Sequence, residues 1–355
     1  MTFYILLFLF VILTSLCFPQ NKTVGMLWIF VLCFLSMFRA ESVGTDTYAY
    51  MEVGGMLYSY GFNSGDSLFG KSSELITVAI YLIMYYYSLS PRLAIVFFSL
   101  VTFFFLYLSL KKLKLSYCIG VVTFLVFFYL SSFNIARQIC ACSIILYAST
   151  YLIENTRRYL FFVFVALASF IHAASILGVA LFFVSLIKNL PFSRKQLTYI
   201  AIVLFIFNMV SPLNVVEMLV SLFSNISFAE TYSDIAMTES RSLMGLIQDA
   251  ATFFVAVLIF NYGDADREMT FMDWLYYCTI LATILSANMH SDVARAFLPI
   301  EFFKVLYIPY QYEREERFLR SKSYWSFMFV SLFFTLWGVS IGNGEVVPYL
   351  LSVSF

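Results

Sequence analysis

The sequence predicts an all-α polytopic membrane protein, a single bundle of about 12–14 transmembrane helices covering residues 1–355. Of its 355 residues 62% are apolar, and Phe and Tyr alone contribute 42 and 25. Charged residues make up only 12%, and the mean hydropathy is +0.88. Folded in water, such a chain could not cover its surface with polar groups, whereas in a bilayer lipid is the outer solvent for every spanning helix.

The remaining composition narrows the function classes. The chain has 21 basic residues (Lys and Arg) and 21 acidic residues (Asp and Glu), so its net charge is zero. It therefore lacks the excess of positive charge that is typical of nucleic-acid-binding proteins. All six Cys lie in apolar runs without metal-ligand spacing or a disulfide framework, which is typical of small core residues. The first apolar run, 3–18, lacks a basic start and a small-residue cleavage site, which indicates a spanning helix.

Apolar runs separated by short polar breaks define the predicted helices. A spanning helix needs about 20 apolar residues, and several of these runs are shorter, as in bundles with tilted or partly sunken helices. The candidate spans are 3–18, 25–38, 75–90, 93–110, 115–131, 136–152, 159–171, 173–187, 197–212, 243–260, 271–287, 296–310 and 325–341.

Basic clusters predict the orientation. Even numbers of spans separate them if 159–187 is a hairpin, so all four face the cytoplasm. They lie at 111–114, 157–158, 188–195 and 314–322. The external face then receives the loops near 131–136, 172, 213–241 and 288–295, and the tail from Gly342.

The loop 39–73 does not fit this count. Counting back through 93–110 and 75–90 places it in the cytoplasm, yet it is acidic, which is not a cytoplasmic signature. Either one early span is re-entrant or the loop faces inward, and we favour a miscounted span.

Arg137 and Gln138 place a guanidinium and an amide at the mouth of a predicted helix. A charge at membrane depth is costly, so it usually faces a cavity or a partner, and the planar guanidinium matches phosphate oxygens. The alternative is an Arg whose side chain extends to the interface.

His172 interrupts the apolar stretch 159–187 and is one of two His in the chain. As one helix the stretch would be about 43 Å long, too long for the bilayer core, so a hairpin with His172 at its outer tip is favoured. There the imidazole could act as a general base on a sugar hydroxyl. The alternative is a structural His hydrogen-bonded to a neighbouring carbonyl.

Two further Arg belong to the same predicted face. Arg295 follows the polar segment 288–294, and Arg241 ends the loop 213–241, whose first part, 213–224, resembles an amphipathic interfacial helix. If they converge with Arg137, the three cations form an anion site suited to a diphosphate.

The loop 41–50 is the most distinctive polar segment. Asp46 can cap a helix or accept hydrogen bonds, and Tyr48 and Tyr50 can stack on sugar faces, although an ordinary turn with interfacial Tyr explains them too. Two carboxylates lie in or next to predicted spans: Asp249, which is beside Gln248 inside a span, and Glu74, which precedes 75–90. A carboxylate at such a position usually has a functional role or pairs with an Arg.

These elements in this order resemble the EpsG-like family of bacterial exopolysaccharide proteins, which overlaps the Wzy-type O-antigen and capsule repeat-unit polymerases. The resemblance covers nearly the whole chain, and Ile171 is a departure, because the family often has Phe directly before this His. The matching segments are Val43-Gly44-Thr45-Asp46-Thr47-Tyr48, Arg137-Gln138, the run 168–175, Arg295 before a Phe/Tyr-rich span, and Pro348-Tyr349.

The resemblance implies a glycosyltransferase of the bacterial inner membrane, with a GT-C-like fold and an active site towards the periplasm. Such a polymerase moves a growing glycan from undecaprenyl diphosphate onto a lipid-linked repeat unit. Arg137, Arg295 and Arg241 would stabilise the departing diphosphate, and His172, with Asp46 second, would act on the acceptor hydroxyl. We expect no metal requirement and no cofactor. The implied partners are the lipid-linked oligosaccharide, the bilayer and a chain-length regulator.

Other function classes share these features. A lipid-linked oligosaccharide flippase or exporter would share the cationic cavity, but the chain is compact and shows no two-half repeat. A membrane acyltransferase that modifies sugars usually has a pair of His, and this chain offers only His172 and His290 for it. An O-antigen ligase remains the nearest alternative.

Overall fold

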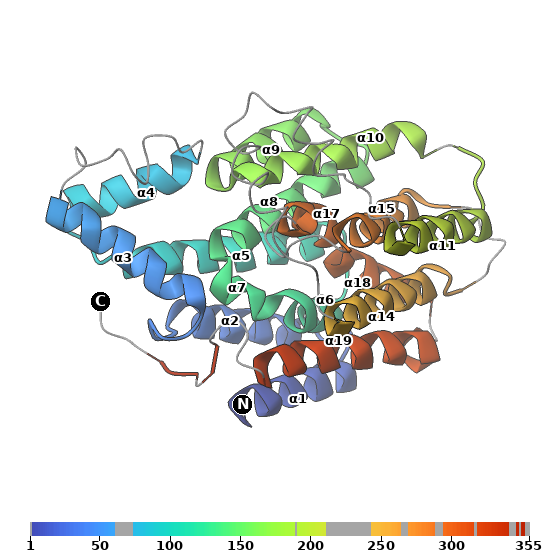
Figure 1. Ribbon diagram of the computed structural model, residues 1–355, viewed down its shortest axis with the longest axis horizontal. Helices are drawn as coiled ribbons and strands as arrows, with labels where there is room; N and C mark the ends of the chain where they lie inside the picture. The colour runs from blue at the N-terminus through green and yellow to red at the C-terminus, as the bar shows by residue number, and fades with distance from the viewer. Residues whose placement is uncertain are drawn as a thin grey trace.

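The computed structural model describes residues 2–60, 74–188, 190–210, 243–263, 269–287, 294–315, 318–340, 346–347 and 349–351. Within these ranges the chain is helical, and its one β-bridge joins Arg39 to Leu351 (Figure 1). The elements are α1 (Thr2–Cys17), α2 (Lys22–Met37), α3 (Thr45–Tyr60), α4 (Leu75–Tyr86), α5 (Arg92–Lys112), α6 (Tyr117–Phe124), the π-helical η2 (Leu125–Tyr129), α7 (Ser131–Asn134), α8 (Ala136–Ile153), α9 (Tyr159–Ile171), the 3₁₀-helical η3 (Ala173–Val179), α10 (Ala180–Ile187), α11 (Arg194–Val210), α14 (Leu243–Phe260), α15 (Phe271–Ser286), η4 (Arg295–Phe297), α17 (Leu298–Glu301), α18 (Lys304–Arg314), η5 (Phe318–Arg320) and α19 (Lys322–Ser340).

Helix α8 lies at the centre of the bundle, packed between α5 and α9. Its small side chains, such as Cys140 and Ala141, are fully buried and let neighbouring helices approach closely. Gly178 of η3 meets Ile145 of α8, where an added Cβ would lie 2.8 Å from the Ile145 side chain. These contacts enclose α8, whose first turn carries Arg137.

The outer helices turn apolar side chains away from the core. Leu6, Phe10, Phe30 and Phe329 are each more than half exposed. Among the described residues two helices, Arg92–Lys112 and Ala136–Ile153, are long and apolar enough to cross a membrane, and the other apolar helical stretches have 10–17 residues. An all-helical bundle with an apolar outer surface is the arrangement expected of a polytopic membrane protein.

The four basic clusters gather at one end of the bundle, as the parity of the spans predicts. Lys112 pairs with Glu154 at 3.5 Å. The Ser116 hydroxyl donates to the carbonyl of Pro19 at 2.5 Å, and Gln20 reaches the Tyr312 hydroxyl at 3.2 Å. We call this the basic end, and the opposite end, which carries 39–45, 131–137, 172 and 295, the site end.

A buried ion pair closes the basic end. Arg194 donates to Asp273 at 2.6 Å, and both side chains are inaccessible. The same carboxylate accepts from Tyr307, while Asp273 and Thr270 form a capping box at the start of α15. Arg194 therefore joins α11 to α15, and through Asp273 to Tyr307 of α18.

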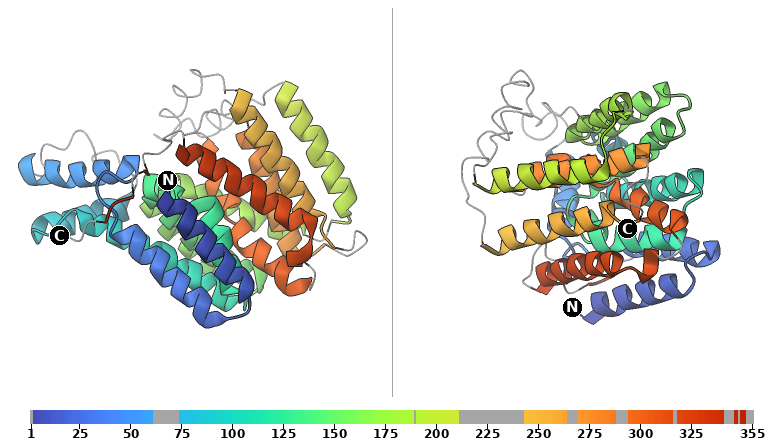
Figure 2. Two further views of the ribbon diagram at one scale, coloured as in Figure 1. Left: turned by 90° about the horizontal axis from the view of Figure 1, so that it is seen from below. Right: turned by 90° about the vertical axis from the view of Figure 1, so that its right-hand side faces the viewer.

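The helix expected to span the membrane at 75–90 does not run from one end of the bundle to the other. It is therefore the miscounted span that the acidic loop 39–73 indicated. Helix α4 starts beside Arg137 and His172, and a few residues after its end Arg92 donates to the carbonyl of Arg39. Both ends of α4 therefore lie at the site end. Helices α3 and α4 pack together and project from the bundle as a pair (Figures 1 and 2).

Several expected spans are irregular. The span 115–131 changes from α6 to the π-turn η2, and 173–187 begins as 3₁₀ helix. The span 296–310 is divided into η4, α17 and α18, and Pro299 and Pro309 lie in its helices. Irregular backbone in a membrane bundle is tolerated where it lines a cavity. The expected interfacial helix 213–224 lies outside the described residues.

Candidate functional site

Glu74 links Arg137 and His172 at the site end. One carboxylate oxygen, Oε2, accepts from Nη1 of Arg137 at 2.5 Å, and Oε1 lies 2.9 Å from Nδ1 of His172. The backbone N–H of Ala173 also donates to Oε1, at 3.3 Å. One carboxylate thus orients both a cation and an imidazole, drawn from different helices.

The local chain positions His172 at a helix break. It follows the end of α9 in an extended conformation, with φ at −148°, and precedes the tighter turns of η3. Thr77 of α4 donates to the carbonyl of Ile171 at 2.9 Å, which ties the start of α4 to this tip. The predicted hairpin is therefore present, and the imidazole partner is a carboxylate rather than a neighbouring carbonyl.

Arg137 lies in the first turn of α8, directly after a break at Ile135. Its guanidinium carbon is 5.6 Å from the ring centre of Tyr50, and its backbone N–H points to the Tyr50 hydroxyl at 3.5 Å. About a third of the side chain remains exposed. Arg137 is thus held on one side and accessible on the other.

The segment 41–50, expected as a loop, is helical from Thr45 as the start of α3, and it is docked onto the α7–α8 turn. Gly44 has a φ of +91°, and an added Cβ there would lie 2.7 Å from the carbonyl oxygen of Phe133. The N–H of Thr45 donates to the Asn134 side chain at 3.1 Å. The buried Arg39 donates to both Thr47 and the carbonyl of Phe133. These contacts place Asp46 beside the first turn of α8.

Arg295 is positioned through its backbone. The side-chain amide of Gln138 donates to the carbonyl of Arg295 at 2.6 Å, while the Arg295 guanidinium is exposed. Gln138 itself is buried in α8. It therefore fixes the start of η4 against the same helix end that carries Arg137.

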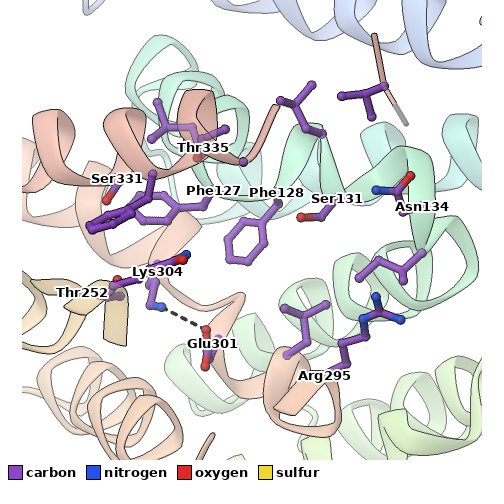
Figure 3. Close-up of a pocket in the computed structure, with 18 residues that line it drawn as sticks. Phe127, Phe128, Ser131, Asn134, Thr252, Arg295, Glu301, Lys304, Ser331 and Thr335 are labelled. Atoms are coloured by element: carbon purple, nitrogen blue, oxygen red, sulfur yellow. Dashed lines mark hydrogen bonds and ion pairs between the residues drawn. The ribbon is translucent and has the colours of Figure 1, made fainter. Parts of the chain in front are cut away.

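These side chains share one cavity of about 160 Å³. Six polar residues and Ile135 surround it: Asp46, Tyr50, Arg137, Gln138, His172 and Arg295. Ile135 and Arg295 also line a second cavity of about 380 Å³, which extends between α14, α17 and α19 (Figure 3). The two cavities therefore adjoin at Arg295.

The carboxylates have opposite electrostatic surroundings. Burial raises the pKa of Asp46, an effect that the charges of Arg295 and Arg137 only partly offset. Burial would also raise the pKa of Glu74, but the hydrogen bond with His172 and the charge of Arg137 outweigh it and lower that pKa. Glu74 is thus the more firmly ionised of the two.

The structure does not bring every predicted residue to the cavity. Tyr48 is 62% exposed on α3, and Asp249 lies on α14 outside both linings. Glu74 is behind the cavity wall, so its contacts suit positioning rather than substrate binding. Arg241 and the segment 288–293 lie outside the described residues.

Sequence reasoning missed the charged pair Lys304 and Glu301, whose side chains lie 3.1 Å apart beside the larger cavity. Their signal was present, because opposite charges three residues apart inside a predicted span are unusual. Among the described residues no group of three His, Cys, Asp or Glu could hold a metal ion, and the expected absence of a metal stays a prediction.

The arrangement can bind an anion and move a proton. Arg137 and Arg295 offer guanidinium groups to one cavity, and His172 and Asp46 offer two candidate bases. The combination suits displacement of an oxyanion leaving group by a hydroxyl.

Comparison with known proteins gives one result. No curated protein matches the chain, and no solved structure matches it, so the GT-C-like fold stays a prediction. The model of the EpsG family matches residues 22–351, nearly the whole length. The match includes the segment 41–50, the start of α8, the tip at His172 and Arg295. The chain therefore belongs to the EpsG family.

Proposed function

We propose that this protein is a bacterial polysaccharide polymerase that transfers a growing glycan from undecaprenyl diphosphate onto a lipid-linked repeat unit. The site would face the outside of the cytoplasmic membrane. The observation that carries the proposal is the single cavity shared by Arg137, Arg295, His172 and Asp46. Membership of the EpsG family supports a polymerase-type membrane protein.

In the proposed reaction a hydroxyl oxygen of the acceptor sugar attacks the anomeric carbon of the donor. The bond from that carbon to the phosphate oxygen breaks, and undecaprenyl diphosphate leaves with the electron pair. Arg137 and Arg295 meet the charge that develops on the phosphate. Removing one such donor typically lowers a rate by about 10²–10³.

The acceptor proton passes to His172. Because Nδ1 faces the ionised Glu74, the neutral ring carries its proton on Nδ1 and keeps the Nε2 lone pair. Nε2 is buried and has no hydrogen-bond partner among the described residues. A general base of this kind contributes about 10²–10⁴ to a rate. Asp46 is the second candidate base on the same cavity.

The test uses a deletion strain complemented with Arg137→Ala or His172→Ala. We expect the ladder of surface glycan lengths to collapse to a single repeat unit, measured by gel electrophoresis at matched protein levels. Arg157→Gln is the control, because Arg157 is exposed at the basic end. It should leave the ladder unchanged.

Other outcomes identify other functions. A strain with no surface repeat at all would indicate a flippase, and polymer retained on its lipid carrier would indicate a ligase. Normal ladders in both variants would remove the catalytic roles of Arg137 and His172.

A further inference from the structure

The larger cavity is lined by polar side chains without a hydrogen-bond partner among the described residues. Ser131, Gln248, Thr252 and Ser331 line it, and their side chains make no hydrogen bond to a described residue. None of the four residues is fully buried, and Gln248 is exposed, so their polar groups are accessible from the cavity. Four such groups around one cavity therefore point to water or a ligand as their usual partner.

An irregular backbone segment contributes to the wall of the larger cavity. The π-turn η2 places Phe127 and Phe128 on its wall, and Thr335 of α19 donates to the carbonyl of Val126 at 2.9 Å. That bond satisfies a carbonyl within the π-turn, whose hydrogen-bonding pattern differs from that of an α-helix. Single π-turns occur frequently at functional sites.

The deep part of the cavity is electrically balanced. Lys304 is 2% exposed and pairs with Glu301, which also accepts from the Ser286 hydroxyl at 3.3 Å. Figure 3 shows this pair near Thr252 and Ser331, with Arg295 and Asn134 towards the other side. Because the charges of Lys304 and Glu301 offset each other, the deep part favours an uncharged, hydroxyl-rich ligand, whereas Arg295 lies next to the small cavity.

The volumes of the two cavities indicate that one ligand would occupy both. At about 160 Å³ the small cavity is below the roughly 300–1,000 Å³ of typical small-molecule sites, whereas the 380 Å³ cavity is within that range. A diphosphate-linked sugar bound at Arg137 and Arg295 must therefore extend beyond the small cavity. The larger cavity, which shares Arg295, is the adjoining space.

We propose that the larger cavity is the oligosaccharide subsite, in which Gln248, Thr252 and Ser331 hydrogen-bond uncharged sugar residues while Phe127, Phe128 and Phe334 contact their apolar faces. Hydroxyl and amide groups beside aromatic rings match the mixed polar and apolar surface of a sugar. The proposal rests on the proposed function, because it assumes that the ligand carries a glycan.

The test measures binding of the lipid-free repeat-unit oligosaccharide to purified full-length protein in detergent. We expect the double variant Thr252→Val with Ser331→Ala to weaken binding roughly 30-fold, because it removes two hydrogen bonds of about 1 kcal/mol each and about 1.4 kcal/mol corresponds to a factor of ten. Thr252→Ser keeps the hydroxyl and should bind as the wild type does. Melting temperatures of all variants identify any loss of folding.

Arg137→Ala separates this proposal from the proposed function. It should retain oligosaccharide binding while losing chain extension. If Arg137→Ala abolishes extension but the double variant binds normally, the subsite is wrong and the polymerase stands. If the double variant loses binding while Arg137→Ala extends chains normally, the subsite stands and the catalytic assignment is wrong.

Oligosaccharide probes of different length show whether the cavity binds the acceptor repeat unit or the growing chain. Equal affinity for one repeat unit and for a fragment of several units indicates the acceptor, and affinity that rises with length indicates the growing chain. Absence of binding by the folded wild-type protein at millimolar oligosaccharide would overturn the proposal.

Discussion

At the scale of single residues, the geometry of the candidate site depends most on the carboxylate of Glu74. It contacts Arg137 and His172 at once, and its side chain is only 12% exposed. Loss of its charge would leave Arg137 without its carboxylate partner and Nδ1 of His172 without an ionised acceptor. A buried group with two charged or polar partners is costly to neutralise.

We predict that Glu74→Gln slows chain extension about 10²-fold while the protein still folds, because the amide keeps the shape but not the charge that orients His172. The rate of polymer formation in membranes measures this. Glu52→Gln, at an exposed position of α3, is the matched control. A rate equal to that of the control would contradict the positioning role.

The stability effect of Glu74 should depend on pH. Its folded pKa is lowered, so the carboxylate stabilises the fold fully above its unfolded pKa of about 4.3, and that contribution is lost as pH falls through the folded value. The melting temperature of the wild type should exceed that of Glu74→Gln at pH 7, and the two should converge in acid. A gap that persists at the lowest pH would show that the ionised form is not responsible.

At the scale of elements, turns and helix breaks rather than regular helices position the candidate functional side chains. Gly44 allows α3 to dock on the carbonyl of Phe133, the break at Ile135 begins α8 at Arg137, and the extended His172 ends α9. Each is a short departure from regular helix that brings a polar side chain to the site end.

We predict that Gly44→Ala destabilises the protein by at least about 1–2 kcal/mol, because its φ of +91° is unfavourable for Ala and its Cβ would clash with Phe133. Chain extension should fall as well, because Asp46 moves with this turn. Ser42→Ala, exposed in the same loop, is the control. An unchanged melting temperature and ladder would show that the turn does not hold the site.

At the scale of the whole molecule, the two ends of the bundle differ in kind. The basic end is closed by the buried pair of Arg194 and Asp273, whereas the site end contains two adjoining cavities. The C-terminal residues complete the site end, because Tyr349 donates to the carbonyl of Leu35 and Leu350 accepts from Ala40.

We predict that the site end faces outward, because positive charge is retained on the cytoplasmic side. In a Cys17→Ser background, a thiol introduced by Ser42→Cys should react with a membrane-impermeant maleimide applied to spheroplasts. The thiol from Asn155→Cys, exposed at the basic end, should react only after lysis. The reverse pattern would overturn the orientation.

The sequence by itself determined the helical class, most span positions and the gathering of basic clusters, because hydropathy and charge act locally along the chain. It also singled out Arg137, His172, Asp46 and Arg295. It could not show that Glu74, 98 residues from His172, contacts that ring, or that α4 fails to cross. Such facts depend on contacts between distant segments, so only the tertiary structure decided which polar residues share a cavity and which, like Tyr48, do not.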